Sequence, residues 1–272
     1  MSGVQRPGPD AIGRGAAAPP GASAGRPVVL FDLDDTLMAH REAVAAGIVR
    51  HLHERGYAAD EAAAQALWHE LEERHYHAYL AGELTFEQQR RARATEFARA
   101  HGDTLDDESA GVWFTTYFER YRESWALHDD VLPALAALER ALPGVRFGII
   151  TNGEHDFQLA KLVRLGLEVG HPGRIEHLVA SGAEGVTKPD RRIFEVAVAR
   201  FASGGAVSGA AYVGDRLRTD AIGAAEAGLV GVWINRQGAP MAEPEASDAA
   251  AAGVLEIRGL AELAPLLATR LG

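Results

Sequence analysis

The sequence predicts an α/β protein whose parallel sheet has helices on both faces and is interrupted by an inserted all-helical domain. Short apolar runs recur along the chain, and most of them alternate with helical patterns, which is the order of βαβ units. Between residues 37 and 127 this alternation stops, and we find no convincing strand pattern there. We therefore expect a second, smaller helical domain inserted after the first strand, over the carboxyl edge of the sheet.

The composition is that of a globular chain and excludes several kinds of site. Of the 272 residues, 47% are hydrophobic and 24% are charged, an ordinary balance for a folded protein. Because the chain has no cysteine, disulfides, thiolate zinc sites, iron–sulfur clusters and cysteine nucleophiles are excluded. The net charge of −11 argues against a broad nucleic-acid-binding surface. We expect a cytoplasmic monomer or homodimer with no nucleic-acid or membrane partner.

Three segments with different compositions set the expected domain boundaries. Residues 1–26 are mostly Gly, Ala and Pro, and without large apolar side chains they predict a disordered tail rather than a secretory signal. We expect residues 27–40 and 128–272 to form the α/β core. The inserted helical domain takes residues 41–127.

The predicted strands are continuous apolar runs, which are typical of strands buried on both faces. The first run, 28–31, ends directly in a cluster of acidic residues. The later runs are 145–152, a shorter one at 177–181, 210–215, 230–235 and a weaker one at 254–257.

Helices are predicted from apolar periodicity and from their end signals. Gly166 and Gly228 each follow a helical pattern at the position that favours a left-handed residue, and Pro189 fits a first helical turn. Thr85 and Gln88 have the spacing of a capping box. We expect core helices over 154–165, 190–201 and 219–227, and inserted helices over 42–55, 59–81, 85–100 and 107–124.

Two stripes of largely aromatic side chains lie at helical spacing in the insert. We interpret both as packing surface rather than as a cofactor-binding face. They consist of Trp68, Leu71, His75 and Tyr79, and of Trp113, Tyr117, Tyr121 and Trp125.

The acidic cluster after the first strand is the first candidate site. In an extended chain Asp32 and Asp34 point the same way, whereas Asp35 points the other way. Two close carboxylates repel each other, so either one is protonated or a cation lies between them. Oxygen ligands without thiolates favour Mg²⁺. The alternative is that these acids are only cap and turn residues.

Three later segments bring compatible groups to the same sheet edge. The sequence TNG at 151–153 offers a hydroxyl and, through its glycine, free backbone N–H groups that suit a phosphate oxygen. Lys188 precedes a helix, where a cation opposes the macrodipole, so we expect anions to hold it. Asp215 and Asp220 follow another strand and can reach one cation. Because ligands of open α/β sheets bind at this edge, the set predicts a divalent metal and an anionic ligand.

Taken in order, the segments FDLDDTL, ITNG, KPD and GDRLRTD resemble the four signature motifs of the haloacid dehalogenase-like hydrolase superfamily. The resemblance covers essentially residues 27–235, and the insert directly after the first motif resembles the helical-cap subclass of that superfamily. It implies a Rossmann-like sheet with the first strand in the centre. It also implies that the helical cap supplies much of the substrate specificity.

The resemblance further implies a role for each matching residue. Asp32 matches the nucleophile that forms an aspartyl-phosphate, and Asp34 matches the general acid/base. Thr151, Asn152 and Lys188 match the groups that bind the phosphoryl oxygens. The implied Mg²⁺ ligands are Asp32, Asp34 through its backbone carbonyl, Asp215 and Asp220.

We therefore expect a Mg²⁺-dependent phosphomonoester hydrolase acting on a small phosphorylated metabolite. A 2-haloacid dehalogenase is the first alternative, but it attacks carbon without a metal, and Asp34, Asp215 and Asp220 argue against it. A phosphosugar mutase uses the same acids, and no feature of the sequence favours it. A non-catalytic relative has no need for a second carboxylate at position 34.

Overall fold

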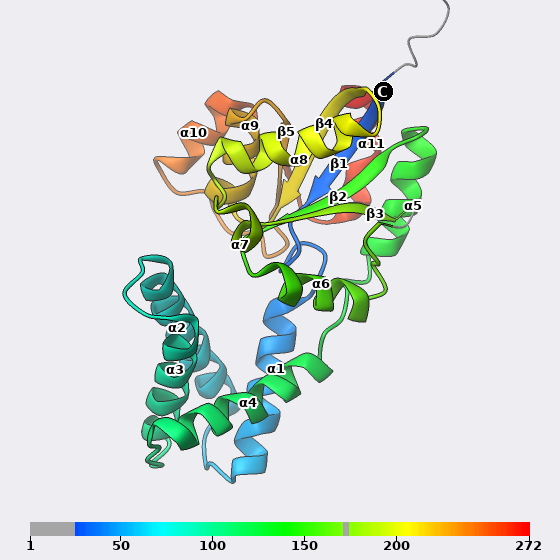
Figure 1. Cartoon of the computed structure of the whole chain (residues 1–272). Coiled ribbons are helices and arrows are strands. Elements are labelled where there is room, and N and C mark those ends of the chain that lie inside the picture. The colour runs from blue at the N-terminus through cyan, green and yellow to red at the C-terminus, as the bar shows by residue number, and fades with distance from the viewer. Residues whose placement is uncertain (1–24, 171–173) are drawn as a thin grey trace, which may run out of the picture.

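The α/β core of the protein is a parallel sheet of six strands, seen in a computed structural model that describes residues 25–170 and 174–272 (Figure 1). The strands lie in the order β3-β2-β1-β4-β5-β6, and each neighbouring pair is parallel. The central position of β1 confirms the expected Rossmann-like arrangement, and the strand order reverses beside it. The strands are β1 (Arg26–Phe31), β2 (Arg146–Thr151), β3 (Ile175–Ala180), β4 (Val207–Gly214), β5 (Val230–Ile234) and β6 (Leu255–Ile257).

Helices cover both faces of this sheet. Successive side chains of a strand point to opposite faces, so each central strand packs against both layers of helices. Val28 and Leu30 belong to the buried cluster that includes α8, whereas Val29 and Phe31 belong to the cluster that includes α5 and α11. The core helices are α5 (Val131–Ala141), α6 (His155–Arg164), α7 (Ser181–Glu184), α8 (Arg191–Ser203), α9 (Gly223–Glu226), α10 (Glu245–Ala252) and α11 (Leu263–Leu271), with a π-helix η1 (Leu217–Ile222) and a 3₁₀ turn η2 (Leu260–Glu262).

The predicted core helices agree with the structure in two of three cases. Helices α6 and α8 confirm the predictions over 154–165 and 190–201 to within two residues. The prediction over 219–227 is wrong in type, because the π-helix η1 precedes the short α9. The sequence analysis does not predict α5, α10 or α11.

Four helices between β1 and α5 form the helical insert that the sequence predicts (Figure 1). Thr85 and Gln88 make both hydrogen bonds of the predicted capping box. The insert has an aromatic interior, in which Trp68, Phe97 and Trp113 are at most 2% exposed. None of the helices in the described ranges combines the length and the apolarity needed to cross a membrane. The insert consists of α1 (His40–Arg55), α2 (Glu61–Leu80), α3 (Phe86–Ala100) and α4 (Asp107–Glu123).

The two segments that connect the helical insert to the core are paired with each other. Met38 and Leu127 form an isolated antiparallel bridge. The Ala39 N–H donates to the Ala126 carbonyl at 3.0 Å, and the His128 N–H donates to the Leu37 carbonyl at 2.9 Å. A motion of the insert relative to the core therefore has to bend both segments together.

The predicted tail of residues 1–26 falls largely outside the described residues. Arg26 is already part of β1, where its N–H donates to the Ala206 carbonyl at 2.8 Å, so the sheet begins one residue before the predicted start at Pro27.

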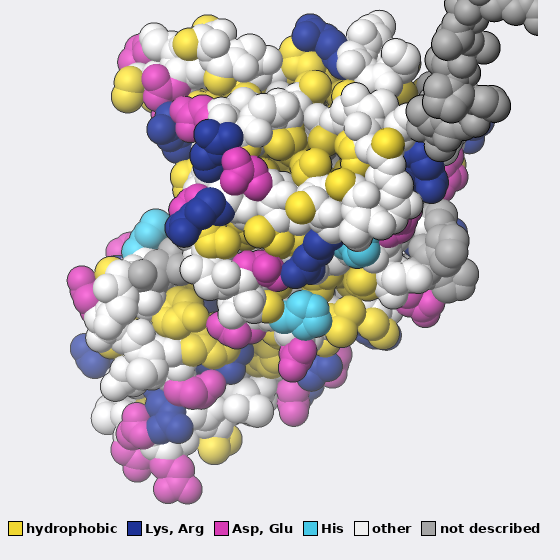
Figure 2. All heavy atoms as spheres, turned by 45° about the horizontal axis from the view of Figure 1, so that its top comes forward, with side chains coloured by type: hydrophobic (Ala, Val, Ile, Leu, Met, Phe, Trp, Pro, Cys, Tyr) yellow, Lys and Arg dark blue, Asp and Glu magenta, His cyan; other side chains and the backbone are white. Residues whose placement is uncertain are grey.

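On the face of the molecule in Figure 2, acidic and basic side chains are interspersed.

Candidate active site

Three carboxylates meet at the carboxyl edge of the central strands. Asp32 directly follows β1, Asp215 directly follows β4, and Asp220 lies in the π-helix η1. Each of them offers a carboxylate oxygen, and these oxygens lie within 4.8 Å of one another. Gly214 permits the close approach, since a Cβ at this position would lie 2.4 Å from the Cβ of Asp220. The structure therefore brings together Asp32, Asp215 and Asp220, three of the four residues predicted to hold one cation. A cation between the carboxylates of Asp32 and Asp34 is also expected from the sequence, but the Asp34 carboxylate is not part of this group.

Lys188 is the cation held among these acids. Its Nζ donates to Asp32 Oδ1 at 2.6 Å, to Asp220 Oδ1 at 2.7 Å and to the Tyr212 hydroxyl at 2.8 Å, and the residue is only 5% exposed. Burial alone lowers the pKa of Lys188, but the carboxylates of Asp220 and Asp32 outweigh burial and raise this pKa well above its usual value. The expectation that anions hold Lys188 is confirmed.

Lys188, with the exposed Arg41 3.8 Å from Asp215, does not balance three carboxylates that are buried or nearly so. Burial raises the pKa of Asp32 to about 7, although Lys188 acts in the opposite direction. Burial, together with repulsion from Asp32 and Asp220, raises the pKa of Asp215 to about 8. A divalent cation would relieve this repulsion, and a set of hard carboxylate oxygens without sulfur fits Mg²⁺.

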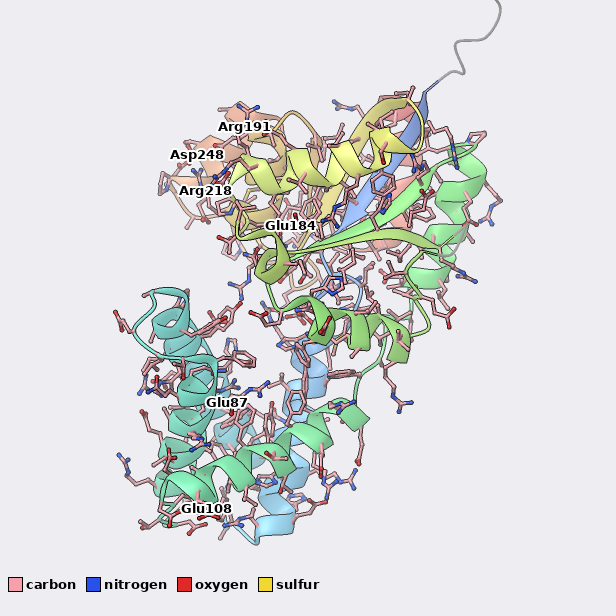
Figure 3. The ribbon with its side chains drawn as sticks, viewed as in Figure 1. Glu87, Glu108, Glu184, Arg191, Arg218 and Asp248 are labelled. Carbon is pink, nitrogen blue, oxygen red and sulfur yellow. The ribbon has the colours of Figure 1, made fainter. Side chains whose placement is uncertain are left out.

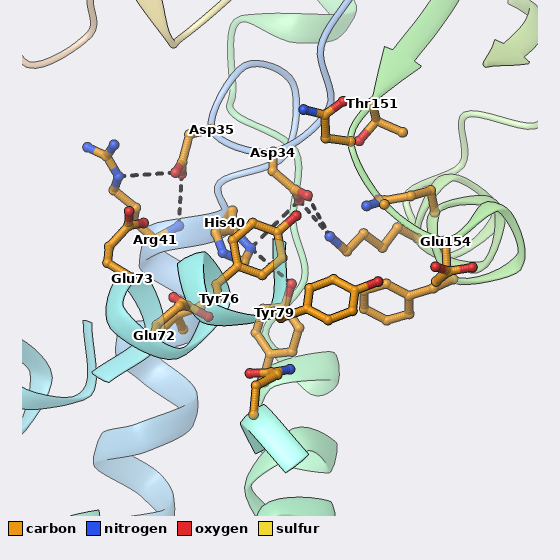
Figure 4. Close-up of a pocket in the computed structure, with 18 of the residues that line it drawn as sticks. Asp34, Asp35, His40, Arg41, Glu72, Glu73, Tyr76, Tyr79, Thr151 and Glu154 are labelled. Carbon is orange, nitrogen blue, oxygen red and sulfur yellow. Dashed lines mark hydrogen bonds and ion pairs between the residues drawn. The ribbon is translucent and has the colours of Figure 1, made fainter. Parts of the chain in front are cut away.

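Asp34 lies beside this cluster and is paired with a different lysine (Figure 4). Lys161 Nζ donates to both carboxylate oxygens of Asp34 at 2.7 Å, and His40 Nδ1 lies 3.6 Å from Oδ1. Burial raises the pKa of Asp34. Lys161, His40 and a hydrogen bond from Gln158 together outweigh burial, so the net pKa lies below its usual value. Lys161 is a buried cation on α6, with 2% exposure.

Lys161 is not among the site residues predicted from the sequence, although its position on the helix could have indicated a buried lysine. Lys161 lies on the same helical face as Phe157 and Leu162, a face that otherwise turns apolar side chains toward the protein interior. A lysine is rarely buried there without an anionic partner. Only the tertiary structure shows that Asp34, 127 residues earlier, is this partner.

Thr151 is the last residue of β2 and Asn152 directly follows it, but the two side chains have different surroundings. Thr151 is 2% exposed and lines the cavity above the acids (Figure 4). The Asn152 side chain accepts from the Lys188 N–H at 2.9 Å and donates to the Lys188 carbonyl at 3.1 Å. Asn152 thus positions Lys188, and its predicted contact with phosphate remains untested.

One detail of the predicted phosphate site is wrong. The Gly153 N–H is not free, because it donates to Ser181 Oγ at 2.9 Å.

Asp35 is not one of the three acids that meet at the sheet edge. It accepts from the Arg41 N–H at 2.8 Å and lies 3.1 Å from Arg41 Nε, so it connects the loop after β1 to α1.

The acids open into a cavity of about 370 Å³ between the core and the helical insert. Its far side is lined by side chains of α2, α3 and α4, including Tyr79, Tyr117 and Tyr121. Tyr117 and Tyr121 also belong to the buried core, with 2% and 5% exposure, so the interpretation of the aromatic stripes as packing surface is confirmed for them. It is likewise confirmed for Trp68 and Trp113, which pack against each other with ring centroids 5.4 Å apart. It does not hold for Tyr79, which is partly exposed and lines the cavity.

Known proteins resemble this chain in sequence and in fold. A family model described as haloacid dehalogenase-like hydrolase matches residues 27–228. Phosphoserine phosphatase from Thermus thermophilus is 37% identical over 145 residues, so the alignment covers 53% of this chain and about half, 55%, of that protein. Ribulose-1,5-bisphosphate 5-phosphatase from Halopiger xanaduensis is 30% identical over 228 residues, covering 82% of this chain and 88% of that protein.

The solved structures agree on the fold. The magnesium-bound HAD-hydrolase YfnB from Bacillus subtilis superposes with a TM-score of 0.69 and 21% identity, covering 89% of this chain and 99% of that one. The family match covers strands β1 to β4 from Pro27 onward, the insert and every residue of the acidic cluster. The chain therefore belongs to the haloacid dehalogenase-like hydrolase family.

Proposed function

We propose that this protein is a Mg²⁺-dependent phosphomonoester hydrolase that acts on a small phosphorylated metabolite through an aspartyl-phosphate on Asp32. The observation that carries the proposal is the convergence of Asp32, Asp215 and Asp220, of which Asp32 and Asp220 share Lys188. Among the described residues, Asp215 has only the more distant Arg41 as an ion-pair partner, at 3.8 Å. The surplus of negative charge on the three acids calls for a divalent cation, and such a cation with Lys188 suits a dianionic phosphoryl group. The phosphatase names of two relatives support this reaction class.

The first half-reaction is the attack of Asp32 on phosphorus. A carboxylate oxygen of Asp32 forms a bond to phosphorus while the ester P–O bond breaks and the alkoxide leaves. Lys188, 2.6 Å from Asp32 Oδ1, favours the ionised form of the nucleophile against the effect of burial, and binds the incoming phosphate. When bound by Asp32, Asp215, Asp220 and the Asp34 carbonyl, Mg²⁺ supplies charge neutralisation on the transferring group. The hydroxyl of Thr151 binds another phosphoryl oxygen.

The second half-reaction depends on Asp34. Asp34 takes up a proton from water, gives it to the leaving oxygen and, as a carboxylate, then takes a proton from the water that hydrolyses the aspartyl-phosphate. Lys161 favours the ionised form of Asp34, which the hydrolytic step requires. A side chain held ready to activate water supports a hydrolase over a mutase, which has to protect its phosphoenzyme from water.

The dehalogenase alternative has no use for much of this site. Attack on carbon needs neither a metal nor the acids Asp215 and Asp220, which are costly to bury together. Their presence at 13% and 1% side-chain exposure therefore favours phosphoryl transfer.

The test is phosphate release by the full chain from p-nitrophenyl phosphate and from a panel of phosphorylated metabolites. We expect EDTA to abolish release, Mg²⁺ to restore it, and Ca²⁺ to inhibit it, because the larger ion accepts more ligands and lets a carboxylate bind through both oxygens. Full activity after exhaustive EDTA treatment, or halide release from a 2-haloacid, would overturn the proposal.

A further inference from the structure

The cavity extends well beyond the space that a phosphate group needs. Its near end holds Asp32, Thr151 and Lys188, and its far end is formed by side chains of α3 and α4. A volume of about 370 Å³ is in the range that encloses a complete small-molecule ligand. A three-carbon phosphate ester bound at Asp32 would leave the far end filled with water.

The far end is an aromatic shelf formed by Phe86, Phe114 and Phe118. The rings of Phe114 and Phe118 lie nearly parallel, with an interplanar angle of 20° and centroids 6.3 Å apart. Phe118 also contacts Phe157 of α6, with centroids 5.6 Å apart, so the shelf reaches back to the core. Flat apolar surfaces of this kind favour flat ligands, because stacking on an aromatic ring is nearly independent of the identity of the second ring.

Arg90 adds a second flat surface to the aromatic shelf. Its guanidinium carbon lies 4.0 Å from the ring centre of Phe86 and 5.3 Å from those of Phe114 and Phe118. The acidic partner of Arg90 is Glu87, which lies in the insert (Figure 3) and has 64% side-chain exposure. A guanidinium plane stacks on planar rings as aromatic side chains do.

Gln89 provides hydrogen-bonding groups beside the aromatic shelf. It lines the cavity with only 3% exposure, and its Oε1 is buried without a hydrogen-bond partner among the described residues. An unpaired buried carbonyl costs free energy, so a ligand that donates to it gains affinity. The planar amide offers an acceptor and a donor side by side, which matches the edge of a heteroaromatic ring.

We propose that the substrate is a phosphomonoester whose alcohol carries a planar heteroaromatic ring, as in a nucleoside 5′-monophosphate. The ring stacks on the aromatic shelf and its edge bonds to Gln89, while the phosphate reaches Asp32. This inference rests on the proposed phosphatase function and narrows its substrate class.

The charges of the insert disfavour a small ester that carries its own carboxylate. Arg93 is bound to Glu72, with Nη2 and Oε1 2.8 Å apart, and is 6% exposed. Glu72 and Glu73 both line the cavity, and Glu73 lies 3.4 Å from Arg216 of the core (Figure 4). Because Arg93 and Arg216 are already paired with these acids, neither is free to pair with a second negative group on the alcohol, whereas a neutral ring needs no such partner.

The test compares substrates that share the phosphoribosyl end and differ only in the ring. We expect kcat/KM with Mg²⁺ to be at least fivefold higher for uridine or adenosine 5′-monophosphate than for ribose 5-phosphate, the lower end of the fold-change expected from stacking. Values for both nucleotides below five times that of ribose 5-phosphate would overturn the inference.

Two variants locate the effect at the aromatic shelf. Phe118→Leu removes a stacking ring, and Gln89→Met removes the amide without changing its volume greatly, so each should lower the ratio of nucleotide to ribose 5-phosphate kcat/KM by about fivefold. Val112→Ala, on α4 but 63% exposed and outside the cavity, is the matched control and should leave the ratio unchanged. A ratio that both Phe118→Leu and Gln89→Met leave unchanged would place the ring elsewhere and overturn the inference.

Hydrolysis of p-nitrophenyl phosphate distinguishes a failure of the phosphatase proposal from a failure of the proposed substrate class. If the wild-type chain with Mg²⁺ hydrolyses p-nitrophenyl phosphate but shows no preference for the nucleotides, only the substrate class is wrong. If p-nitrophenyl phosphate and every ester in the panel remain intact, the phosphatase proposal and this inference both fail. If Phe118→Leu does not fold, as judged by its melting curve, the wild-type ratio and Gln89→Met still decide.

Discussion

The core side and the insert side of the cavity are built in different ways. On the core side, buried charged groups stand at the ends of strands and are held by short bonds, such as Lys188 Nζ to Asp32 at 2.6 Å. On the insert side, aromatic side chains from α2, α3 and α4 form the wall and make mainly van der Waals and cation–π contacts. The core side is thus suited to one reaction, whereas the insert side presents a shape that selects among substrates.

This difference predicts which phosphate esters are affected by a substitution on each side of the cavity. A change on the core side should affect all phosphate esters alike, since every ester presents the same phosphoryl group to Asp32. A change on the insert side should affect some esters more than others. The predictions below test this division, beginning with the largest expected effect.

The first prediction is that Asp32→Asn abolishes turnover of every ester. The amide keeps the size of the side chain but cannot form an aspartyl-phosphate. Rapid-quench labelling with a phosphorus-labelled substrate, followed by peptide mapping, should find the label on Asp32 in the wild type and on no residue in the variant. A trapped phosphoenzyme in Asp32→Asn would break the assignment of the core side.

The second prediction is that Asp34→Asn lowers kcat for alkyl phosphates by about 10²–10⁴-fold, the usual contribution of general acid–base catalysis. p-Nitrophenyl phosphate should suffer less in the phosphorylation step because its leaving group needs no proton. The variant should also accumulate phosphoenzyme, since the hydrolytic step has lost its base. Equal losses for both leaving groups, without phosphoenzyme, would contradict this role.

The third prediction concerns Lys161, which acts through Asp34 as a positioning residue. Lys161→Met removes the cation 2.7 Å from both Asp34 oxygens, and we expect kcat for alkyl phosphates to fall by roughly tenfold, less than in Asp34→Asn. Lys161→Arg should restore part of the loss because it keeps the charge. A loss confined to KM, with kcat unchanged, would place Lys161 in substrate binding instead.

The fourth prediction links Mg²⁺ to pH. The folded-state pKa values of Asp32, about 7, and Asp215, about 8, lie above the usual value for an aspartate, so protonation of these groups stabilises the metal-free fold. That stability is fully present below about pH 4 and is lost as the pH rises through 7 and 8. Mg²⁺ competes with these protons and should therefore stabilise the protein more at pH 8 than at pH 6.

The measurement for this prediction is the melting temperature with and without Mg²⁺ at the two pH values. At about 100 times its Kd, Mg²⁺ stabilises by about 2.7 kcal/mol, which corresponds to roughly 5–10 °C at pH 8. The shift at pH 6 should be less than half as large. Asp215→Asn is the control and should lose the shift at both pH values. Equal shifts at pH 6 and pH 8 in the wild type would contradict the prediction.

Much of the core side can be predicted from the sequence. The acids after β1 and β4, Thr151 and Lys188 each lie at the end of an apolar run or at a helix start, and the parallel order of βαβ units brings such ends to one edge. The residue types and their positions along the chain therefore suffice. The free N–H expected at Gly153 is an exception, because its partner Ser181 follows a different strand.

The insert side and the Lys161–Asp34 pair could not be predicted in this way. Tyr79 has the same helical spacing as the buried Trp68, and spacing alone cannot separate a residue that packs inside from one that is partly exposed and lines a cavity. Lys161 needs a partner that lies 127 residues earlier in the chain.

The sequence by itself determined the sheet, the helical insert, the acids at the strand ends and the need for a cation among them. These features depend on local apolar periodicity and on the topology of parallel strands, and both can be recognised from the order of residues in the chain. Only the tertiary structure decided which aromatic rings face the cavity and which lysine pairs with which acid. Those outcomes depend on how separate helices pack against each other and against the sheet, which no local pattern specifies.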